Sequence, residues 1–289
     1  MNLLKHSLLT AYYTSTIPQR RRAARRRAAA GGEPVSILFY HRVADDSPNA
    51  WTMRCRTFRR QMEWVARRFE VVSLQEAQQR IVAGRNDRPT VAITFDDGYA
   101  DNCDFALPLL LRMGLPFTYF VATDHARTGL PFAHDVAAGV KLRPNTIEQI
   151  RSLAAAGVEV GAHTRSHADL GRIRDRQQLR DEIAGSKRDL EAMIDRPVVY
   201  FACPFGLHAN LSADAFATCY EAGFAGVCSA YGAYNLPGGD AFHLRRIHAD
   251  PELLRLKNWL TVDPRKARVA DFDPGDYKTA AAAPAGGSA

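Results

Sequence analysis

The 289-residue chain has 46% hydrophobic and 24% charged residues, which is typical of a globular protein with one large domain or two small ones. Its formal net charge of +7 comes largely from six arginines between residues 20 and 27. The rest of the chain is close to neutral and gives little support for a nucleic-acid-binding surface. Five scattered cysteines without a CxxC pair argue against a disulfide framework or a cysteine zinc site, and favour a reducing compartment.

We interpret residues 1–33 as a basic, partly amphipathic leader. The arginines follow the mildly apolar stretch, which is the opposite order to a signal peptide, and no run of about 18 apolar residues predicts a membrane span. Two roles for this leader are open. It could be a basic segment that frays in solution, or residues 1–27 could make a peripheral contact with an anionic membrane surface. We therefore expect a cytoplasmic protein, with peripheral attachment to the inner membrane face left open, and no nucleic-acid or protein partner.

From Pro34 onward, candidate strands and helices alternate along the chain. Strands are expected at residues 35–40, 71–72, 90–95, 117–122, 158–162, 198–202 and 225–229. Helices are expected at residues 57–68, 106–113, 146–156, 179–194 and 213–222, and a further helix begins near residue 74. Ser73 with Glu76 predicts a capping box. The alternation predicts βαβ units, and about seven repeats favour a distorted (β/α) barrel of parallel strands over residues 34–268. Residues 269–289 are expected to be a low-complexity tail.

Side chains that can bind metals follow several of these strands. His41 follows strand 35–40, and Asp96 and Asp97 follow strand 90–95. His163 follows strand 158–162, and His167 comes four residues later. In a barrel the carboxyl ends of the strands meet at one rim, so these side chains should converge there.

The adjacent carboxylates Asp96 and Asp97 would repel each other, which would push one of them towards protonation. They could form a solvated turn. Alternatively, one could bind a cation and leave the other free as a base. His163 and His167, spaced i, i+4, would share one face of a helical turn and could bind that cation, although an exposed polar pair is the commoner reading of such spacing. Two imidazoles and one carboxylate suit a catalytic divalent metal, with Asp97 as ligand and Asp96 as base.

At these residues the chain resembles the polysaccharide deacetylases of carbohydrate esterase family 4, the proteins with a NodB-homology domain. The segment TFDDG at 94–98 matches the first motif of that family, and HTRSH at 163–167 matches the second. The segments ILFYHRV at 37–43 and FACPFG at 201–206 resemble the branch with an N-terminal Tyr-His-x-Val motif. The resemblance covers about residues 34–250.

The resemblance implies a barrel of the NodB-homology type. It also implies a metal-dependent hydrolase that removes N-acetyl, occasionally O-acetyl, groups from a sugar, an oligo- or polysaccharide, or a lipid-linked glycan precursor. Asp97, His163 and His167 would bind the metal, most often Zn²⁺, with Co²⁺, Ni²⁺ or Mn²⁺ as alternatives. Asp96 would be the general base towards a metal-activated water, and the peptide N–H of Phe205 would help to hold the oxyanion.

The sequence departs from the family pattern at Ala202, where many members have an arginine that tethers the base. Arg246 lies on a late strand and could supply this charge, and His248, two residues further on, shares its face. His248 is our first candidate for the general acid and His41 the second. His41, Pro204 and Tyr234 are expected to contact substrate, and the loop residues Trp51, Phe132 and Tyr234 are candidates for stacking on sugar rings, with ordinary packing as the alternative.

Two other functions compete with a deacetylase. An inactive family member could act as a metal- or glycan-binding domain, which the missing arginine at Ala202 favours slightly. Asp96 argues against this reading, because a protein that only binds has no need of a base. A nucleic-acid or membrane adaptor that works through its arginine run is the third reading.

Overall fold

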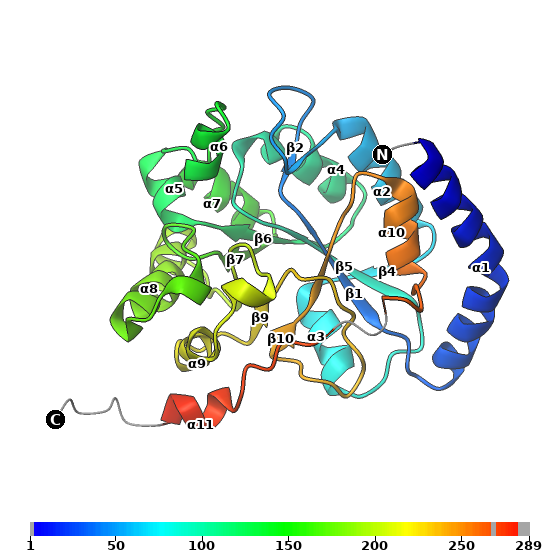
Figure 1. The fold of residues 1–289 in the computed structure, drawn as a ribbon. Helices are drawn as coiled ribbons and strands as arrows, with labels where there is room; N and C mark the ends of the chain where they lie inside the picture. Colours follow the sequence, from blue (N-terminus) through cyan, green and yellow to red (C-terminus); the bar gives the residue numbers. More distant parts are fainter. Residues whose placement is uncertain (1–2, 267–269, 283–289) are drawn as a thin grey trace.

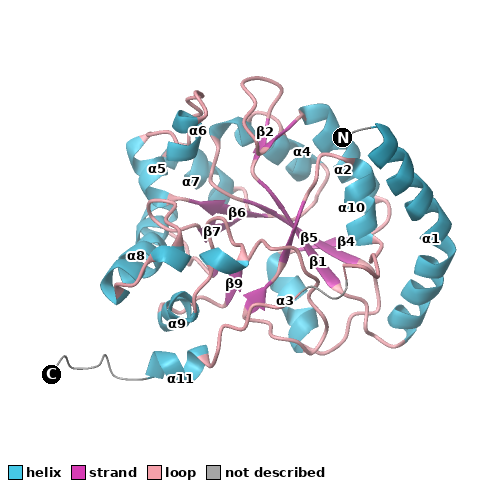
Figure 2. Ribbon diagram, in the orientation of Figure 1, coloured by secondary structure: helices cyan, strands magenta, loops and turns pink. Residues whose placement is uncertain are grey.

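The structure, a computed structural model, describes residues 3–266 and 270–282 (Figures 1 and 2). The main sheet contains β1 (Val35–Tyr40), β4 (Glu70–Val72), β5 (Thr90–Phe95), β6 (Thr118–Val121), β7 (Glu159–Ala162), β8 (Tyr200–Ala202), β9 (Gly226–Cys228), β10 (His243–Leu244) and β11 (Arg246–His248). The short strands β2 (Arg42–Val43) and β3 (Thr52–Met53) pair separately.

Helices surround this sheet (Figure 2). They are α1 (Leu3–Ala29), α2 (Cys55–Ala66), α3 (Leu74–Val82), α4 (Ala106–Arg112), α5 (Thr123–Thr128), α6 (Ala133–Ala137), α7 (Ile147–Ala155), α8 (Arg176–Ile194), α9 (Ala213–Glu221), α10 (Leu253–Leu260) and α11 (Tyr277–Ala282), with the 3-10 turns η1 (Ala100–Cys103), η2 (Leu170–Arg172) and η3 (His208–Asn210). None of the helices in the described part of the chain has both the length and the apolar character that crossing a bilayer requires.

The strands of the main sheet are all parallel and curl into a nearly closed barrel. Their order is β10-β9-β8-β7-β6-β5-β1-β11, with β4 beside the first half of β5. Only Arg245 separates β10 from β11, and β10 pairs with β9 while β11 pairs with β1. The two ends of the sheet are thus formed by nearly consecutive residues. This arrangement confirms the predicted barrel of about seven parallel strands.

The long central strands β1 and β5 explain why the barrel forms. All six residues of each strand are buried, as expected for parallel strands that are covered on both faces. Alternate residues point to opposite faces. Leu38 and Ile93 belong to the large core beneath the helices, whereas Ile37 and Ala92 belong to a smaller core with Leu244 inside the barrel.

Helix α1 is part of the folded structure and lies along α10, contrary to the expected separate leader (Figure 1). The guanidinium of the buried Arg20 donates hydrogen bonds to the carbonyl oxygen of Asn258 at 3.1 Å, to its side-chain oxygen at 2.8 Å, and to the Thr261 hydroxyl at 3.1 Å. The Tyr12 hydroxyl donates to Asp263 at 2.8 Å. Sequence periodicity missed this packing because polar side chains make much of the contact.

Other elements also differ from expectation. Ser73 caps α3 through Glu76 N–H, but the Glu76 carboxylate pairs with Arg80. The reciprocal capping box is instead at the start of α7. Part of the expected tail packs on the barrel, because Asp271 pairs with Arg245 and the Tyr277 ring stacks on Phe242 at 4.6 Å. Residues 283–289 lie outside the described residues.

Candidate active site

The candidate active site lies at the carboxyl ends of the barrel strands and is built by strand alternation. Ile37 is paired with Ala92 and with Arg246, so these three share the inner face of the barrel. Two residues further along each strand, Phe39 is paired with Thr94 and with His248. A further step on the same side leads to His41 after β1 and to Asp96 after β5. The inward positions therefore bring His41, Asp96 and His248 to one rim, in a cavity of about 340 Å³.

Asp97 reaches this rim because the backbone turns sharply. By alternation its side chain would point away from that of Asp96. Asp97 instead has φ of 72°, in the left-handed region that residues other than glycine seldom adopt. Gly98 N–H donates to the Asp96 carbonyl oxygen at 2.9 Å and closes the turn. The strained turn therefore aims both carboxylates into the same cavity.

The second motif forms an irregular loop rather than the expected helical turn. Thr164 and His167 both have φ of 61°. Glu182 of α8 holds the loop, because its Oε2 atom accepts hydrogen bonds from the N–H groups of Arg165 and Ser166, each at 3.0 Å. The two histidines meet through this left-handed backbone and not through helical i, i+4 geometry, so that premise of the sequence analysis was wrong.

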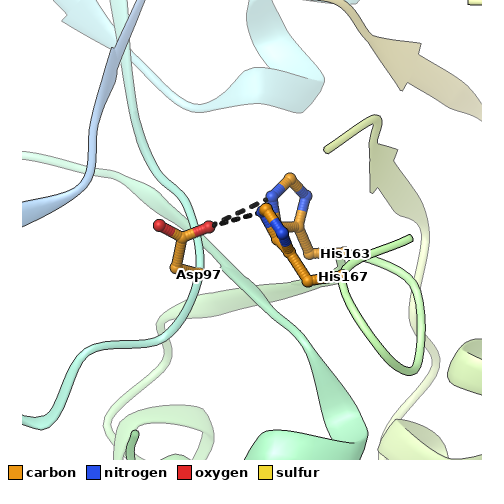
Figure 3. Close-up of side chains that lie close together, drawn as sticks. All are labelled: Asp97, His163 and His167. Carbon is orange, nitrogen blue, oxygen red and sulfur yellow. Dashed lines mark ion pairs between the residues drawn. The ribbon is translucent and has the colours of Figure 1, made fainter. Parts of the chain in front are cut away.

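The structure brings Asp97, His163 and His167 together (Figure 3). The Asp97 Oδ1 atom lies 3.4 Å from His163 Nε2 and 3.2 Å from His167 Nε2. One ligand atom from each residue lies within 4.8 Å of the other two. Asp97 and His163 are buried, and the side chain of His167 is 10% exposed.

The chemistry of this cluster fits a divalent cation. His163 Nδ1 lies 2.8 Å from the carbonyl oxygen of Ala202, which can only accept, so Nδ1 carries a proton and Nε2 is the ring nitrogen that faces Asp97. The Asp97 Oδ1 atom is buried, and within the described part of the chain no group donates a well-aligned hydrogen bond to it. Two imidazole nitrogens and a carboxylate oxygen that face one another in this way could share a cation, and this donor set is common for zinc.

The electrostatics of Asp97 keep it ionised. Burial alone would raise the pKa of this carboxyl group. The interactions with His163 and His167 outweigh burial and hold the pKa of Asp97 well below its usual range. A carboxylate that stays deprotonated is the form that binds metals.

Asp96 has a different partner, which is Arg246. The guanidinium donates from Nη1 to Oδ1 at 2.6 Å and from Nη2 to Oδ2 at 2.8 Å, and both side chains are buried. Arg246 also donates to Ser229 O at 3.0 Å and to Thr94 Oγ1 at 3.1 Å. The charge absent at Ala202 is thus present on β11, and the bidentate geometry fixes the orientation of Asp96.

His41 and His248 share one wall of the cavity with Trp51. The ring of Trp51 lies 4.7 Å from that of His41 and 5.8 Å from that of His248, and 46% of its surface is exposed. Burial lowers the pKa of His41 to about 4, so this imidazole is neutral near pH 7. Burial also lowers the pKa of His248, and the Asp250 carboxylate opposes this effect.

The third motif forms a tight turn that lines the cavity beside His167. Phe205 has φ of 61°, its side chain is 49% exposed, and its ring lies 5.0 Å from that of His167. None of the described residues accepts a hydrogen bond from Phe205 N–H. Gly206 has φ of 60°, and a Cβ atom there would lie 2.7 Å from Ala230, so only glycine fits. Pro204 is buried beneath this turn and does not line the cavity.

Two expected substrate contacts besides Pro204 are contradicted by the structure. Tyr234 packs against Trp259 of α10 and donates to its carbonyl oxygen at 2.8 Å, and it does not line the cavity. Phe132 is fully buried between His125 and His134, so it cannot stack on a sugar ring. Both are ordinary packing residues, because the loops that carry them fold against neighbouring helices or loops.

Sequence reasoning missed His134, which lines the cavity from α6. Its Nε2 atom lies 3.0 Å from the Tyr99 hydroxyl, which donates to Asp135 at 2.8 Å. Asn49 donates to the same carboxylate at 2.7 Å. This network joins three loops around the site. The signal that could have found His134 is its position in a polar loop after the strand at 117–122.

Comparison with known proteins places this geometry in a family. The model of the polysaccharide deacetylase family matches residues 83–222, which include both the Asp-Asp turn and the histidine loop. Residues 83–222 form a polysaccharide deacetylase domain. This polysaccharide deacetylase domain is the part of the barrel that carries Asp96, Asp97, His163 and His167.

A sequence relative is the Bacillus subtilis (strain 168) protein YxkH, whose name assigns it provisionally to the polysaccharide deacetylases. It is 27% identical over 172 residues, which are 59% of this chain and 56% of YxkH. The chain thus matches a little over half the length of that relative.

Solved structures show the same fold. IcaB from Ammonifex degensii has a TM-score of 0.65 at 24% identity, over 80% of this chain and 98% of IcaB. The Streptococcus pyogenes deacetylase PplD, solved with acetate, has a TM-score of 0.67 at 19% identity, over 79% and 99%. A de-N-acetylase from Aggregatibacter actinomycetemcomitans has a TM-score of 0.65 at 19% identity, over 78% and 100%.

Proposed function

We propose that this protein is a metal-dependent hydrolase that removes N-acetyl groups from an N-acetylated sugar, an oligo- or polysaccharide, or a lipid-linked glycan precursor. The observation that carries the proposal is the buried Asp97–His163–His167 cluster beside a second carboxylate, Asp96, that has its own cationic partner. The polysaccharide deacetylase domain supports the substrate class.

The two carboxylates would have separate roles. Asp97, His163 and His167 would bind a divalent metal, most often Zn²⁺ by the donor set, with Co²⁺, Ni²⁺ or Mn²⁺ as alternatives. Such a metal lowers the pKa of water and polarises a carbonyl group. Asp96 would accept the proton of the attacking water. Its carboxylate has about four acceptor sites, so two hydrogen bonds from Arg246 leave room for a proton.

Two further groups would complete the reaction. The Phe205 N–H would donate to the developing oxyanion, and losing one such donor typically costs about 3 kcal/mol of transition-state stabilisation. His248 would protonate the departing amine. We prefer it to His41 because burial lowers the pKa of His41 to about 4, which leaves little of the protonated form at neutral pH. Acetate and a free amino sugar would be the products, and Trp51 offers an exposed ring for sugar stacking.

The first test is metal content together with acetate release from a panel of N-acetylglucosamine oligomers. We expect about one bound divalent metal per chain, acetate release, loss of both on treatment with a chelator, and recovery on adding Zn²⁺ or Co²⁺. Metal-free protein from a purification without chelators, inactive with every added metal, would contradict the proposal.

The choice between the two histidines has its own test. His248→Gln should lower kcat about 100-fold, within the usual range for a lost general acid, whereas His41→Gln should have a smaller effect. A proton donor must be protonated, so wild-type kcat/KM should fall as the pH rises through its pKa. His248→Gln should remove this alkaline limb. Its loss in His41→Gln instead would make His41 the donor.

The inactive, binding-only member is the alternative function. Ala202 favoured this alternative, because many members of the family have an arginine at that position to tether the base and this chain does not. Arg246 supplies a charged partner for Asp96 from another strand, and this weakens the alternative. Bound metal without acetate release from any N- or O-acetylated glycan would restore it.

We also propose a cytoplasmic location. All five cysteines are free thiols, and Cys203, Cys219 and Cys228 are buried, as expected in a reducing compartment. Cell fractionation tests this location, and recovery of the protein from the culture medium or the periplasm would contradict it.

A further inference from the structure

Helix α1 has an inner and an outer side. Arg20 and Arg27 are seven residues apart, about two turns, and both face inward. Arg20 is held by Asn258, and Arg27 pairs with Glu33 at 3.3 Å. These contacts fix the rotation of α1 on the barrel. The side chains between them on the opposite side must therefore point to solvent.

The outer side carries four exposed arginines, which we call the outer arginine cluster: Arg21, Arg22, Arg25 and Arg26. They line a shallow recess together with Pro18 and Ala29. Helix α1 contains no acidic residue. Within the described residues, the arginines of α1 that form ion pairs are Arg20 and Arg27, so no carboxylate neutralises the cluster.

The same outer side carries exposed leucines nearer the N-terminus. Leu4 is 65% exposed and Leu8 is 62% exposed. Leu4 and Leu8 are four residues apart, about one turn, and so are Arg22 and Arg26 beyond Pro18, so α1 presents one exposed pair of each kind. A surface that contacts both must offer negative charge and apolar groups.

We propose that the outer side of α1 binds the surface of a lipid bilayer that contains anionic phospholipids. Lipid phosphates would occupy the recess among the outer arginine cluster, and Leu4 and Leu8 would enter the boundary between headgroups and acyl chains. Nucleic acid would satisfy the arginines but offers no apolar layer into which the exposed leucines could insert. The folded helix also presents its charges already ordered, which avoids the entropy cost of ordering a leader on binding.

The test uses full-length protein and sedimentation with vesicles of phosphatidylcholine alone, or of phosphatidylcholine mixed with the anionic lipid phosphatidylglycerol. We expect binding to the anionic vesicles only, and its loss in about 0.5 M salt, where screening is strong. The triple variant Arg22→Gln, Arg25→Gln and Arg26→Gln should bind about 100-fold more weakly, at about fivefold for each arginine.

Matched variants make the result specific. The control is a second triple variant, which combines Arg112→Gln, Arg172→Gln and Arg196→Gln. It lowers the net charge by the same amount as the α1 triple variant, at exposed positions elsewhere on the barrel. This control variant should bind the anionic vesicles as the wild type does. A triple lysine variant of the α1 positions should also bind, because the attraction is to charge. Unchanged thermal unfolding of each variant would show that α1 stays folded, and glutamine is a good helix former.

Three outcomes would overturn the proposal. The first is equal binding to neutral and anionic vesicles. The second is an equal loss of binding in the matched triple variant, which would reflect net charge alone. The third is tight binding to double-stranded DNA or RNA of random sequence without vesicle binding. The proposal is independent of the hydrolase activity, so neither failure implies the other.

Discussion

Asp96→Asn should lower kcat for acetate release about 1,000-fold, in the middle of the range for a lost general base. The amide keeps the size of the side chain but cannot accept the proton from water. Asp96 belongs to no part of the Asp97–His163–His167 cluster, so the bound metal should remain. Metal content and single-turnover acetate release on the same preparation measure both effects.

Asp97→Asn is the matched variant, since it makes the same chemical change one residue away. It removes the charge from Oδ1, the buried atom that faces both imidazoles. We expect loss of the metal, and loss of activity that a large excess of metal partly restores. Equal metal loss in both variants, or full activity of Asp96→Asn, would show that the two carboxylates do not have separate roles.

Arg246→Met should reduce the free energy of unfolding by about 3–5 kcal/mol, the usual cost of breaking a buried ion pair on one side. The change leaves Asp96 buried without its cationic partner, and methionine fills part of the volume inside the barrel. Activity should fall as well, because the carboxylate loses the two hydrogen bonds that orient it. Urea unfolding followed by circular dichroism gives the stability, and acetate release gives the activity.

The double variant Arg246→Met with Asp96→Asn separates charge from packing. It removes both charges, so it should regain most of the stability that Arg246→Met loses. A double variant as unstable as the single one would mean that Arg246 acts through packing against Phe39 and Phe120, whose rings lie 4.9 Å and 5.5 Å from the guanidinium. Activity should stay low in the double variant, since the base is missing.

Several parts of this site could be predicted from sequence because they depend on short-range patterns. The apolar run before Asp96 predicts a buried strand, and alternation along β1, β5 and β11 predicts that His41, Asp96 and His248 point inward at one rim. The motifs around Asp97 and His163 predicted which residues the structure brings together as a candidate metal site.

Other parts depend on contacts between distant residues, which no local pattern encodes. The side chains of Asp96 and Arg246 are 150 residues apart in sequence and meet only because β11 pairs with β1 beside β5. Tyr234 could not be placed, because a loop residue carries no periodic signal for the surface that it contacts.

By itself, the sequence determined the parallel α/β architecture and the members of the Asp97–His163–His167 cluster, since hydrophobic periodicity and short motifs are local properties of the chain. Only the tertiary structure decided that His163 and His167 meet through a left-handed loop held by Glu182, and that α1 turns four arginines outward. The physical reason is that backbone strain and helix rotation are fixed by packing and hydrogen bonds from other elements, here Glu182 of α8 and Asn258 of α10.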